Sequence, residues 1–386
     1  MAKSILKLNA ISPLADGVFE GYNYSDSVEN PDGIMVRSAA MADYKVNDNL
    51  IGVARAGAGT NNIPCADYAE KGIVVFNTPG ANANAVKELV ICELFLGGRK
   101  ITDAIDWVKT IKGEGDAVGK LVEKGKGKFV GCEIKGKTLG VIGLGAIGVA
   151  VANSAYALGM NVIGADPYLS TNNALSLSPY VKVVASREEV YKAADFITVH
   201  VPLNADTKAM INADTIALMK DGVVIINNSR GELADTAAVI SALESGKLGR
   251  YITDFPNADL IGVNNCICVP HLGASTPEAE DNCAVMAAQQ LADYIENGNI
   301  KNSVNYPAIS LPRSGAGRLS ILHKNVANLI AKFTSAISAT GLNISNMAST
   351  SKGDYAASIL EVDGIVSDEL IKAIYAVDGV LRVRSL

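Results

Sequence analysis

Residues 137–166 read KTLGVIGLGAIGVAVANSAYALGMNVIGAD, and the 28 residues between Lys137 and Asp166 carry no charge. A run of that length could cross a membrane as one helix. Its six glycines and two asparagines make a poor helix, whereas parallel strands covered on both faces read as continuous apolar runs. We therefore predict a buried strand at 138–142, a turn, a helix at 147–158 and a second buried strand at 162–165.

The turn between the first strand and the helix is GLGAIG, residues 143–148, and fits the G-x-G-x-x-G pattern of dinucleotide-binding turns. Gly143 permits the tight turn, Gly145 lets a pyrophosphate approach the backbone, and Gly148 allows close packing of helix on strand. The helix N-terminus supplies amides and a positive dipole end to the anion. Asp166, 18 residues after Gly148, is placed to bind the adenosine ribose and to repel the extra phosphate of NADP. The pattern predicts an NAD(H) site.

Strands and helices alternate on both sides of this turn. Further strands are predicted at 181–184, 196–201, 223–227, 251–254 and 267–269, and further helices at 187–193, 213–219, 236–245 and 276–297. Such alternation predicts an α/β fold with a doubly wound parallel sheet of the Rossmann type. Earlier strands are predicted at 33–37, 50–54 and 72–76, with a helix at 84–96 and an exposed helix end and loop at 112–137. After a proline-containing linker at 302–316, residues 318–386 show the βαββαβ order of a small ferredoxin-like domain.

Composition limits the classes of protein to which the chain can belong. Its 386 residues are 49% hydrophobic and 19% charged, which excludes a disordered chain and predicts two to three domains. A net charge of −6 argues against a nucleic-acid partner. The six cysteines are expected to be free thiols, and three histidines leave little room for a metal site. Since the N-terminus shows no secretion signal and no membrane span is predicted, we expect a cytoplasmic protein.

Two strand ends carry the candidate catalytic residues. NNSRG (227–231) follows one predicted strand, and VPHLG (269–273) contains the end of another. Because ligands of open α/β sheets bind outside the carboxyl ends of the strands, Arg230 and His271 are predicted to meet over the nicotinamide. Arg230 can hold a substrate carboxylate with two parallel hydrogen bonds, and His271 can exchange a proton with a hydroxyl or carbonyl oxygen. The pair predicts hydride transfer at the carbon beside a carboxylate, whereas His200, between apolar neighbours, is predicted to be structural.

The motifs taken together resemble the D-2-hydroxyacid dehydrogenase family, in the form that carries a C-terminal ACT domain. They are VRS (36–38), RAGAG (55–59), NTPGAN (77–82), the glycine-rich turn, DPY (166–168), NNSRG, PHLGAST (270–276), LHKN (322–325) and GLNI (341–344). The resemblance implies a discontinuous flavodoxin-like substrate-binding domain at 1–90 and 275–308. It also implies a Rossmann-type NAD-binding domain at 91–274 and a regulatory ACT domain at 315–386.

The resemblance further implies an activity: oxidation of 3-phospho-D-glycerate to 3-phosphohydroxypyruvate with NAD, the first step of L-serine biosynthesis. Alternatives are another 2-hydroxyacid dehydrogenase, such as a hydroxypyruvate or glyoxylate reductase, and a non-catalytic NAD-sensing regulator. Relatives dimerise, so a homodimer or homotetramer is expected. The positions that match the family's cofactor contacts, beyond the three glycines, are Ala146, Ile147, Asp166, Ser229, Arg230 and Asp254. Those that match its substrate contacts are Arg37, Ser38, Asn82 and Arg230.

The family's catalytic triad is Arg, Glu and His, and this chain departs from it at the glutamate. The family's glutamate follows a Phe-Pro-x run, but here Ala258 stands at that place and Asp259 comes next. In the family the glutamate hydrogen-bonds the catalytic histidine and keeps the imidazolium available. We hypothesise that Asp259 takes over this task for His271.

Three residues of the C-terminal region match the positions through which serine-sensitive relatives bind serine. They are His323, Asn325 and Asn343. The Pro-Gly that follows the first asparagine in those relatives is replaced by Ala327-Asn328, and glycine there allows a ligand to approach the backbone closely. The sequence leaves two possibilities open: a serine effector site, or a domain that serves only as an oligomer interface.

Overall fold

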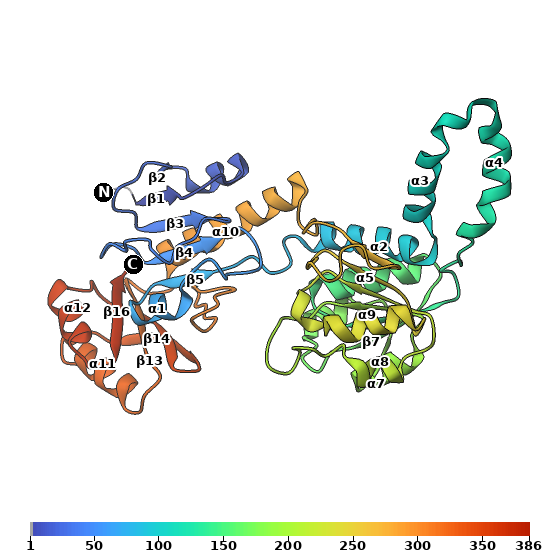
Figure 1. Cartoon of the computed structure of the whole chain (residues 1–386). Helices are drawn as coiled ribbons and strands as arrows, with labels where there is room; N and C mark the ends of the chain where they lie inside the picture. Colours follow the sequence, from blue (N-terminus) through green and yellow to red (C-terminus); the bar gives the residue numbers. More distant parts are fainter. Residues whose placement is uncertain (1–2) are drawn as a thin grey trace. The chain divides into compact units, whose positions relative to one another are not determined.

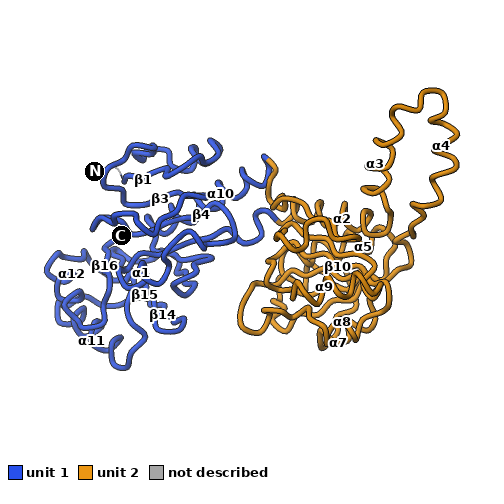
Figure 2. Tube along the Cα trace, viewed as in Figure 1, with its two compact units in different colours: residues 1–82, 277–386 blue, residues 83–276 orange. Residues whose placement is uncertain are grey.

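The computed structural model describes residues 3–386. The chain divides into two compact units, one formed by residues 1–82 and 277–386 and the other by residues 83–276 (Figure 2). The chain therefore leaves the first unit before α2 (Ala83–Gly98) and returns to it at α10 (Pro277–Asn297). The first unit is thus discontinuous in sequence.

The second unit contains a seven-stranded parallel sheet in the order β12-β11-β10-β9-β6-β7-β8, which is the predicted Rossmann arrangement. Its strands are β6 (Thr138–Ile142), β7 (Asn161–Ala165), β8 (Lys182–Val183), β9 (Phe196–Val199), β10 (Val223–Asn227), β11 (Leu248–Thr253) and β12 (Cys266–Cys268). The helices around it are α2, α5 (Ala146–Ala157), α6 (Thr171–Ser176), α7 (Arg187–Ala193), α8 (Ala213–Leu218) and α9 (Thr236–Glu244). The uncharged run 138–165 thus folds as β6, α5 and β7.

Alternate residues of each strand enter different hydrophobic cores, because successive side chains of a strand point to opposite faces. Val224 and Ile226 of β10 pack with residues of α2 and α5, whereas Val223 and Ile225 pack with residues of α7, α8 and α9. The sheet is therefore covered on both faces, and this explains why its strands read as continuous apolar runs.

A helical arm, which includes part of the segment predicted as an exposed helix end and loop, extends from the second unit (Figure 1). It consists of α3 (Ile101–Thr110), α4 (Val118–Gly125) and a short 3-10 turn, Lys126–Phe129. The arm has its own small contact, because the Trp107 ring lies 5.4 Å from the Phe129 ring and close enough to Gly125 to exclude a Cβ there. Lys120 and Lys124 lie on α4, and Lys126 and Lys128 on the 3-10 turn, all of them exposed. The first part of 112–137 is therefore more helical than predicted, whereas residues 130–137 form a loop.

The first unit contains a five-stranded parallel sheet in the order β2-β1-β3-β4-β5, the predicted flavodoxin-like arrangement. Its elements are β1 (Ser4–Lys7), β2 (Asn23–Ser25), β3 (Gly33–Val36), β4 (Gly52–Arg55), α1 (Cys65–Glu70) and β5 (Val74–Phe76). Helix α10 packs on β4, and a Cβ on Gly33 or Gly52 would lie within about 3 Å of the Leu291 side chain. The two glycines therefore allow the helix to approach the sheet closely.

The C-terminal region forms the predicted βαββαβ fold, with an antiparallel sheet in the order β14-β15-β13-β16. Its elements are β13 (Gly317–Lys324), α11 (Leu329–Ser338), β14 (Ile344–Lys352), β15 (Tyr355–Val362), α12 (Asp368–Tyr375) and β16 (Val380–Ser385). One face packs on α11 and α12, and the other contributes Leu322, Ala357 and Ile359 to a core shared with Leu291 and Tyr294 of α10. Both faces of the sheet are thus covered, and the region is grouped with α10 in the first compact unit.

A buried ion pair joins this sheet to the segment that leads into it. Arg318 and Glu361 are 1% and 0% exposed and form a salt bridge. Arg318 also donates to the carbonyl groups of Asn297 and Leu311, at 2.8 Å each, and Glu361 accepts from the amide of Gly315. The predicted linker is therefore held along its length by buried polar contacts.

Three further features of residues 3–386 concern membranes, disulfides and metals. No helix in this range is long and apolar enough to cross a membrane. All six cysteines are free thiols. No group of three or more His, Cys, Asp or Glu side chains in the same range is arranged to hold a metal ion.

Candidate active site

The glycine-rich turn has the geometry that its three glycines require. Gly143 has φ +91°, and a Cβ at this position would lie 2.3 Å from the carbonyl oxygen of His200. A Cβ on Gly148 would lie 1.9 Å from the Gly143 carbonyl oxygen. By contrast, a Cβ on Gly145, the N-cap of α5, would meet nothing within 4 Å. Two glycines are thus required by packing, and the third faces open space.

That open space lies at the N-terminus of α5, where Ala146 is exposed and Ile147 half-buried. The first turn of this 12-residue helix contains no acidic residue, so the helix itself places no negative charge at the positive end of its dipole. Asp166 follows β7, and its two carboxylate oxygens accept hydrogen bonds from the amides of Leu144 and Tyr168, at 2.8 Å each. The carboxylate is thereby fixed beside the turn, as the predicted ribose contact requires. The residues present fit the pyrophosphate and ribose of NAD.

The turn after β10 is organised by a buried asparagine. The Asn227 side chain donates to the carbonyl of Arg230 at 2.9 Å and to the Tyr251 hydroxyl, and it accepts from the Ser229 amide. Ser229 in turn donates from its hydroxyl to the Val199 carbonyl at 2.8 Å. Arg230 Nη1 donates to the Ser229 carbonyl. Since Nε and Nη2 of Arg230 have no hydrogen-bond partner within residues 3–386, they are available to a carboxylate ligand.

Phe255 lies between the two predicted catalytic side chains. Its ring centroid is 4.5 Å from that of His271 and 5.5 Å from the Arg230 guanidinium carbon. The structure therefore brings Arg230 and His271 to the same aromatic ring, with the guanidinium over the ring and the imidazole tilted against it. The sequence reasoning assigned no role to Phe255, although its place directly after Asp254 at the end of β11 was a usable signal.

Asp254 is the carboxylate that the structure associates with His271. It is 1% exposed, and its Oδ2 accepts from the Gly273 amide at 3.2 Å, while its Oδ1 is buried without a partner. Burial raises the pKa of Asp254, and the charges of His271 and Arg230 oppose that rise. An unpartnered buried acceptor calls for a donor, and the carboxamide of a nicotinamide supplies N–H groups. The residues at this end of the site fit the nicotinamide of NAD as well.

Asp259, which we hypothesised to hold His271, is exposed. No hydrogen bond or ion pair within residues 3–386 joins its carboxylate to the His271 ring. Residues 256–259, which follow Phe255, are all exposed, so the acid that comes after Ala258 lies on the surface. The structure gives the hypothesis no support.

His200 has the predicted structural character. Its Nε2 lies 3.0 Å from the Thr198 hydroxyl, and its Nδ1 is buried without a partner. Burial lowers the pKa of His200 to about 4, so the ring is neutral at physiological pH. A neutral histidine at the end of β9 is consistent with packing rather than proton transfer.

Three of the four predicted substrate residues, Arg37, Ser38 and Asn82, belong to the first unit, whereas Arg230 belongs to the second. Arg37 follows β3 and forms an ion pair with Glu280 in the first turn of α10. Ser38 is exposed and accepts from the Asn9 side chain at 3.1 Å. Asn82, at the end of this segment, has a buried Oδ1 without a partner. The Arg37 guanidinium, with a side chain 39% exposed, is accessible to an anion that competes with Glu280.

The three predicted effector residues do not form one site within a single chain. His323 is 3% exposed, and its ring nitrogens lie 2.8 Å from the Lys324 carbonyl and 2.9 Å from the Ser358 hydroxyl. Asn325 follows Lys324, which pairs with Tyr355 of β15. Asn343 precedes Ile344, which pairs with Val362 at the other end of β15. Seven residues of strand separate the two ends by roughly 24 Å.

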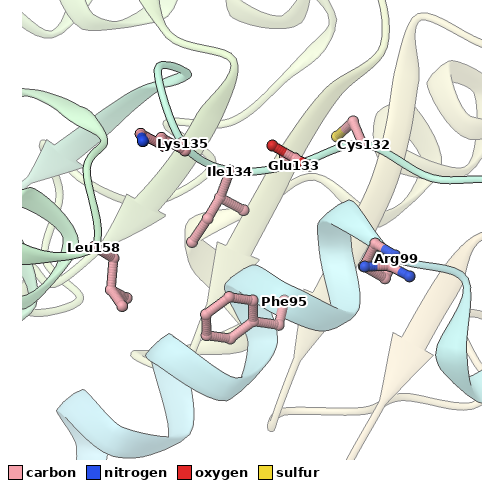
Figure 3. Close-up of a pocket in the computed structure, with 7 residues that line it drawn as sticks. All are labelled: Phe95, Arg99, Cys132, Glu133, Ile134, Lys135 and Leu158. Atoms are coloured by element: carbon pink, nitrogen blue, oxygen red, sulfur yellow. The ribbon is translucent and has the colours of Figure 1, made fainter.

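A pocket of about 250 Å³ lies away from all of these residues (Figure 3). Its lining comes from the C-terminal end of α2, from Leu158 after α5 and from residues 132–135, which precede β6. It is therefore at the amino end of β6, whereas the glycine-rich turn follows the carboxyl end of that strand. The pocket is not part of the candidate active site.

Comparison with known proteins places this arrangement in a family. Residues 98–273 match the family model described as D-isomer specific 2-hydroxyacid dehydrogenase, NAD binding domain. The D-3-phosphoglycerate dehydrogenase of Escherichia coli is 32% identical over 386 aligned residues, covering 96% of this chain and 90% of that protein. The enzyme of the same name from Methanocaldococcus jannaschii is 36% identical over 317 residues, and the match spans 79% of this chain but only 58% of that protein.

A solved structure leads to the same family. The NAD⁺-bound 3-phosphoglycerate dehydrogenase of Entamoeba histolytica is 26% identical, with a TM-score of 0.61 over 79% of this chain and 99% of that one. The match to the E. coli enzyme spans nearly the whole chain. The glycine-rich turn, Asp166 and the Arg230–His271 pair lie where an enzyme of this family would have them. The chain belongs to the NAD-dependent D-isomer specific 2-hydroxyacid dehydrogenases.

Proposed function

We propose that this enzyme oxidises 3-phospho-D-glycerate to 3-phosphohydroxypyruvate with NAD, which is the first step of L-serine biosynthesis. The observation that carries the reaction type is the placement of Arg230 and His271 around Phe255 at the carboxyl ends of the sheet. The relatives named D-3-phosphoglycerate dehydrogenase support the choice of substrate, because the E. coli protein aligns with 96% of this chain, including the C-terminal sheet.

The chain's own residues divide the work of the reaction. Arg230 binds the carboxylate through its free N–H groups and orients the neighbouring carbon. His271 accepts the hydroxyl proton as the carbonyl forms, and its exposed position lets the proton pass on to water. Bound NAD supplies the acceptor for the hydride that leaves the same carbon. Asp254 stabilises the imidazolium electrostatically, and the anionic groups of the substrate match the accessible cation of Arg37.

NADH formation measured with a panel of substrates tests this proposal. We expect turnover with 3-phospho-D-glycerate and NAD, little with NADP, and little with glycerate or lactate. Reduction of glyoxylate or hydroxypyruvate in preference to 3-phosphohydroxypyruvate would reassign the enzyme to those substrates. Tight NADH binding without turnover of any 2-hydroxy acid would indicate an NAD-sensing regulator instead.

We also propose that the chain acts as a homo-oligomer in the cytoplasm. Three large apolar side chains of α3, Ile101, Ile105 and Val108, are 42–52% exposed, which is costly unless another surface covers them. Light scattering of wild type and of Ile105→Glu tests the point. A monomeric wild type, or an unchanged mass in the variant, would contradict an interface on the arm.

Serine is the proposed effector, and its site requires two chains. His323 and Asn325 lie at one end of the C-terminal sheet and Asn343 at the other, so only a neighbouring copy could complete the set. A serine titration of activity and of thermal stability tests this. If neither responds, the C-terminal domain serves another purpose, such as assembly.

A further inference from the structure

Helix α2 contains a buried glutamate that the reaction outlined above does not use. Glu93 is 1% exposed, and within residues 3–386 its carboxyl group forms no ion pair. Leaving an ionised carboxylate buried without a cation is costly, and such a group keeps its proton instead. Burial, with the Asp254 charge as a smaller contribution, raises the pKa of Glu93 to about 8.

The contacts of Glu93 lead to the active-site turn. Its Oε2 accepts a hydrogen bond from Nδ2 of Asn228, in the turn that also carries Ser229 and Arg230. The elements packed on α2 are α5, β10 and β11. The ionisable side chain of α5 is that of Tyr156, which stacks on Tyr180. Strand β11 carries Arg250, which forms a salt bridge with Asp103, and Tyr251, whose hydroxyl accepts from Asn227; the charged residue that follows the strand is Asp254.

Three buried oxygens in this neighbourhood have no hydrogen-bond donor. They are Oε1 of Glu93, Oδ1 of Asn228 and Oδ1 of Asp254. Buried polar atoms are nearly always paired in proteins, so a set of acceptors without donors indicates a missing partner. Protonation turns Oε1 of Glu93 into one O–H donor, which can pair with one of the other two oxygens and leaves at least one acceptor without a donor. A primary carboxamide supplies two N–H groups, and the cofactor of this family ends in one, on its nicotinamide ring.

We propose that Asn228 Oδ1 accepts a hydrogen bond from the nicotinamide carboxamide and that Glu93, as a neutral acid, is the positioning residue that orients Asn228. Asn228 Nδ2 donates to Glu93 Oε2, which leaves Oδ1 of the same amide as the atom available to the carboxamide. With Asp254 as the second acceptor, both N–H groups of the carboxamide are paired. The inference rests on NAD binding by the family and not on the identity of the hydroxy acid.

The test measures binding rather than activity, with two ligands that have the same ADP-ribose part and differ only in whether they carry a nicotinamide. NADH and ADP-ribose both use the glycine-rich turn and Asp166, but ADP-ribose has no nicotinamide. We expect Asn228→Ala to weaken NADH roughly 3–10-fold, the usual effect of one hydrogen bond, and to leave ADP-ribose affinity within twofold. Unchanged NADH affinity, or equal weakening of both ligands, would overturn the proposal.

A cofactor analogue tests the same contact without relying on one variant's fold. The 3-acetylpyridine analogue of NADH replaces the amide NH2 by a methyl group, so wild type should bind it more weakly than NADH. That penalty should shrink several-fold in Asn228→Ala, because the acceptor is already gone. An equal penalty in wild type and variant would show that Asn228 does not meet the carboxamide.

The role of Glu93 has its own signature in the pH dependence of NADH affinity. In wild type the dissociation constant should rise above about pH 8, where Glu93 ionises beside Asp254. Glu93→Gln keeps a neutral group of the same shape, so its dissociation constant should stay near the wild-type value at pH 7 and remain flat to pH 9.5. A rise of the same size in the variant would remove Glu93 from the mechanism.

Discussion

Replacing Glu93 by glutamine should change how the stability of this protein depends on pH. In the unfolded chain a glutamate loses its proton near pH 4.5, whereas in the folded chain burial holds the pKa of Glu93 at about 8. Between these values the folded state binds one proton more than the unfolded state, so raising the pH destabilises it. Each pH unit costs about 1.4 kcal/mol, and the difference of 3.5 units (8 − 4.5) amounts to about 5 kcal/mol.

Glutamine at this position does not titrate and is free of that cost. The free energy of unfolding of Glu93→Gln minus that of wild type should therefore be constant below pH 4.5, rise between pH 4.5 and 8, and level off above. From pH 5.5 to 7.5 the rise is about 2.7 kcal/mol, which for a unit of this size adds roughly 5–10 °C to the difference in melting temperature.

Thermal melts of both proteins from pH 4.5 to 8.5 measure this difference. Glu88→Gln is the matched control, since Glu88 lies on the same helix with a side chain that is 65% exposed. A difference that stays flat with pH, or that falls, would refute the reasoning, because it would mean that Glu93 is ionised in the folded protein. A similar rise for Glu88→Gln would show that the effect comes from net charge and not from burial.

Three further outcomes follow from the site and the core. Asp254→Asn should lower kcat and alter the pH–rate profile, whereas Asp259→Asn should leave the profile unchanged; the opposite result would restore the role first given to Asp259. Asp166→Ala should weaken NADH binding and reduce the preference for NADH over NADPH, which titration with both cofactors measures. An unchanged ratio of the two dissociation constants would contradict this prediction. Glu361→Gln should destabilise the first unit by about 3–5 kcal/mol in chemical denaturation, because it leaves Arg318 buried and unpaired. A loss below 1 kcal/mol would show that the pair is not buried in solution.

The predictable parts of the fold are those in which the local sequence pattern and the tertiary packing favour the same structure. No residue other than glycine fits at positions 143 and 148, because a Cβ there would lie 2.3 and 1.9 Å from a backbone carbonyl oxygen. The turn is therefore recognisable as a sequence motif. The strands of the second unit are apolar throughout because both faces of the sheet are covered. The order of both parallel sheets then follows from strand–helix alternation and the right-handed connections that it imposes.

The structural features that the sequence could not predict depend on packing between separate elements and on the path of a surface loop. The lysines and glycines of residues 118–128 favour a loop by composition, but Trp107, from the neighbouring helix, gives α4 an apolar partner. Likewise the βαββαβ pattern predicts the C-terminal sheet, but it does not reveal that the free face of that sheet packs on α10. The choice between Asp254 and Asp259 depended on the path of one surface loop, which no spacing rule specifies.

Glu93 shows where sequence reasoning could have gone further. It interrupts the run LVIC-E-LFL of α2, at a position where the helical period places a core side chain. An acid at such a position lowers stability at neutral pH by several kcal/mol, and a leucine or methionine would not. Glu93 destabilises the fold by this amount, and its one hydrogen bond joins it to the turn that carries Arg230. A role in the site therefore explains the residue better than a role in packing does. A charged residue inside an otherwise apolar helix next to a dinucleotide-binding turn is therefore a signal for a positioning residue, and Glu93→Gln tests whether the signal can be trusted.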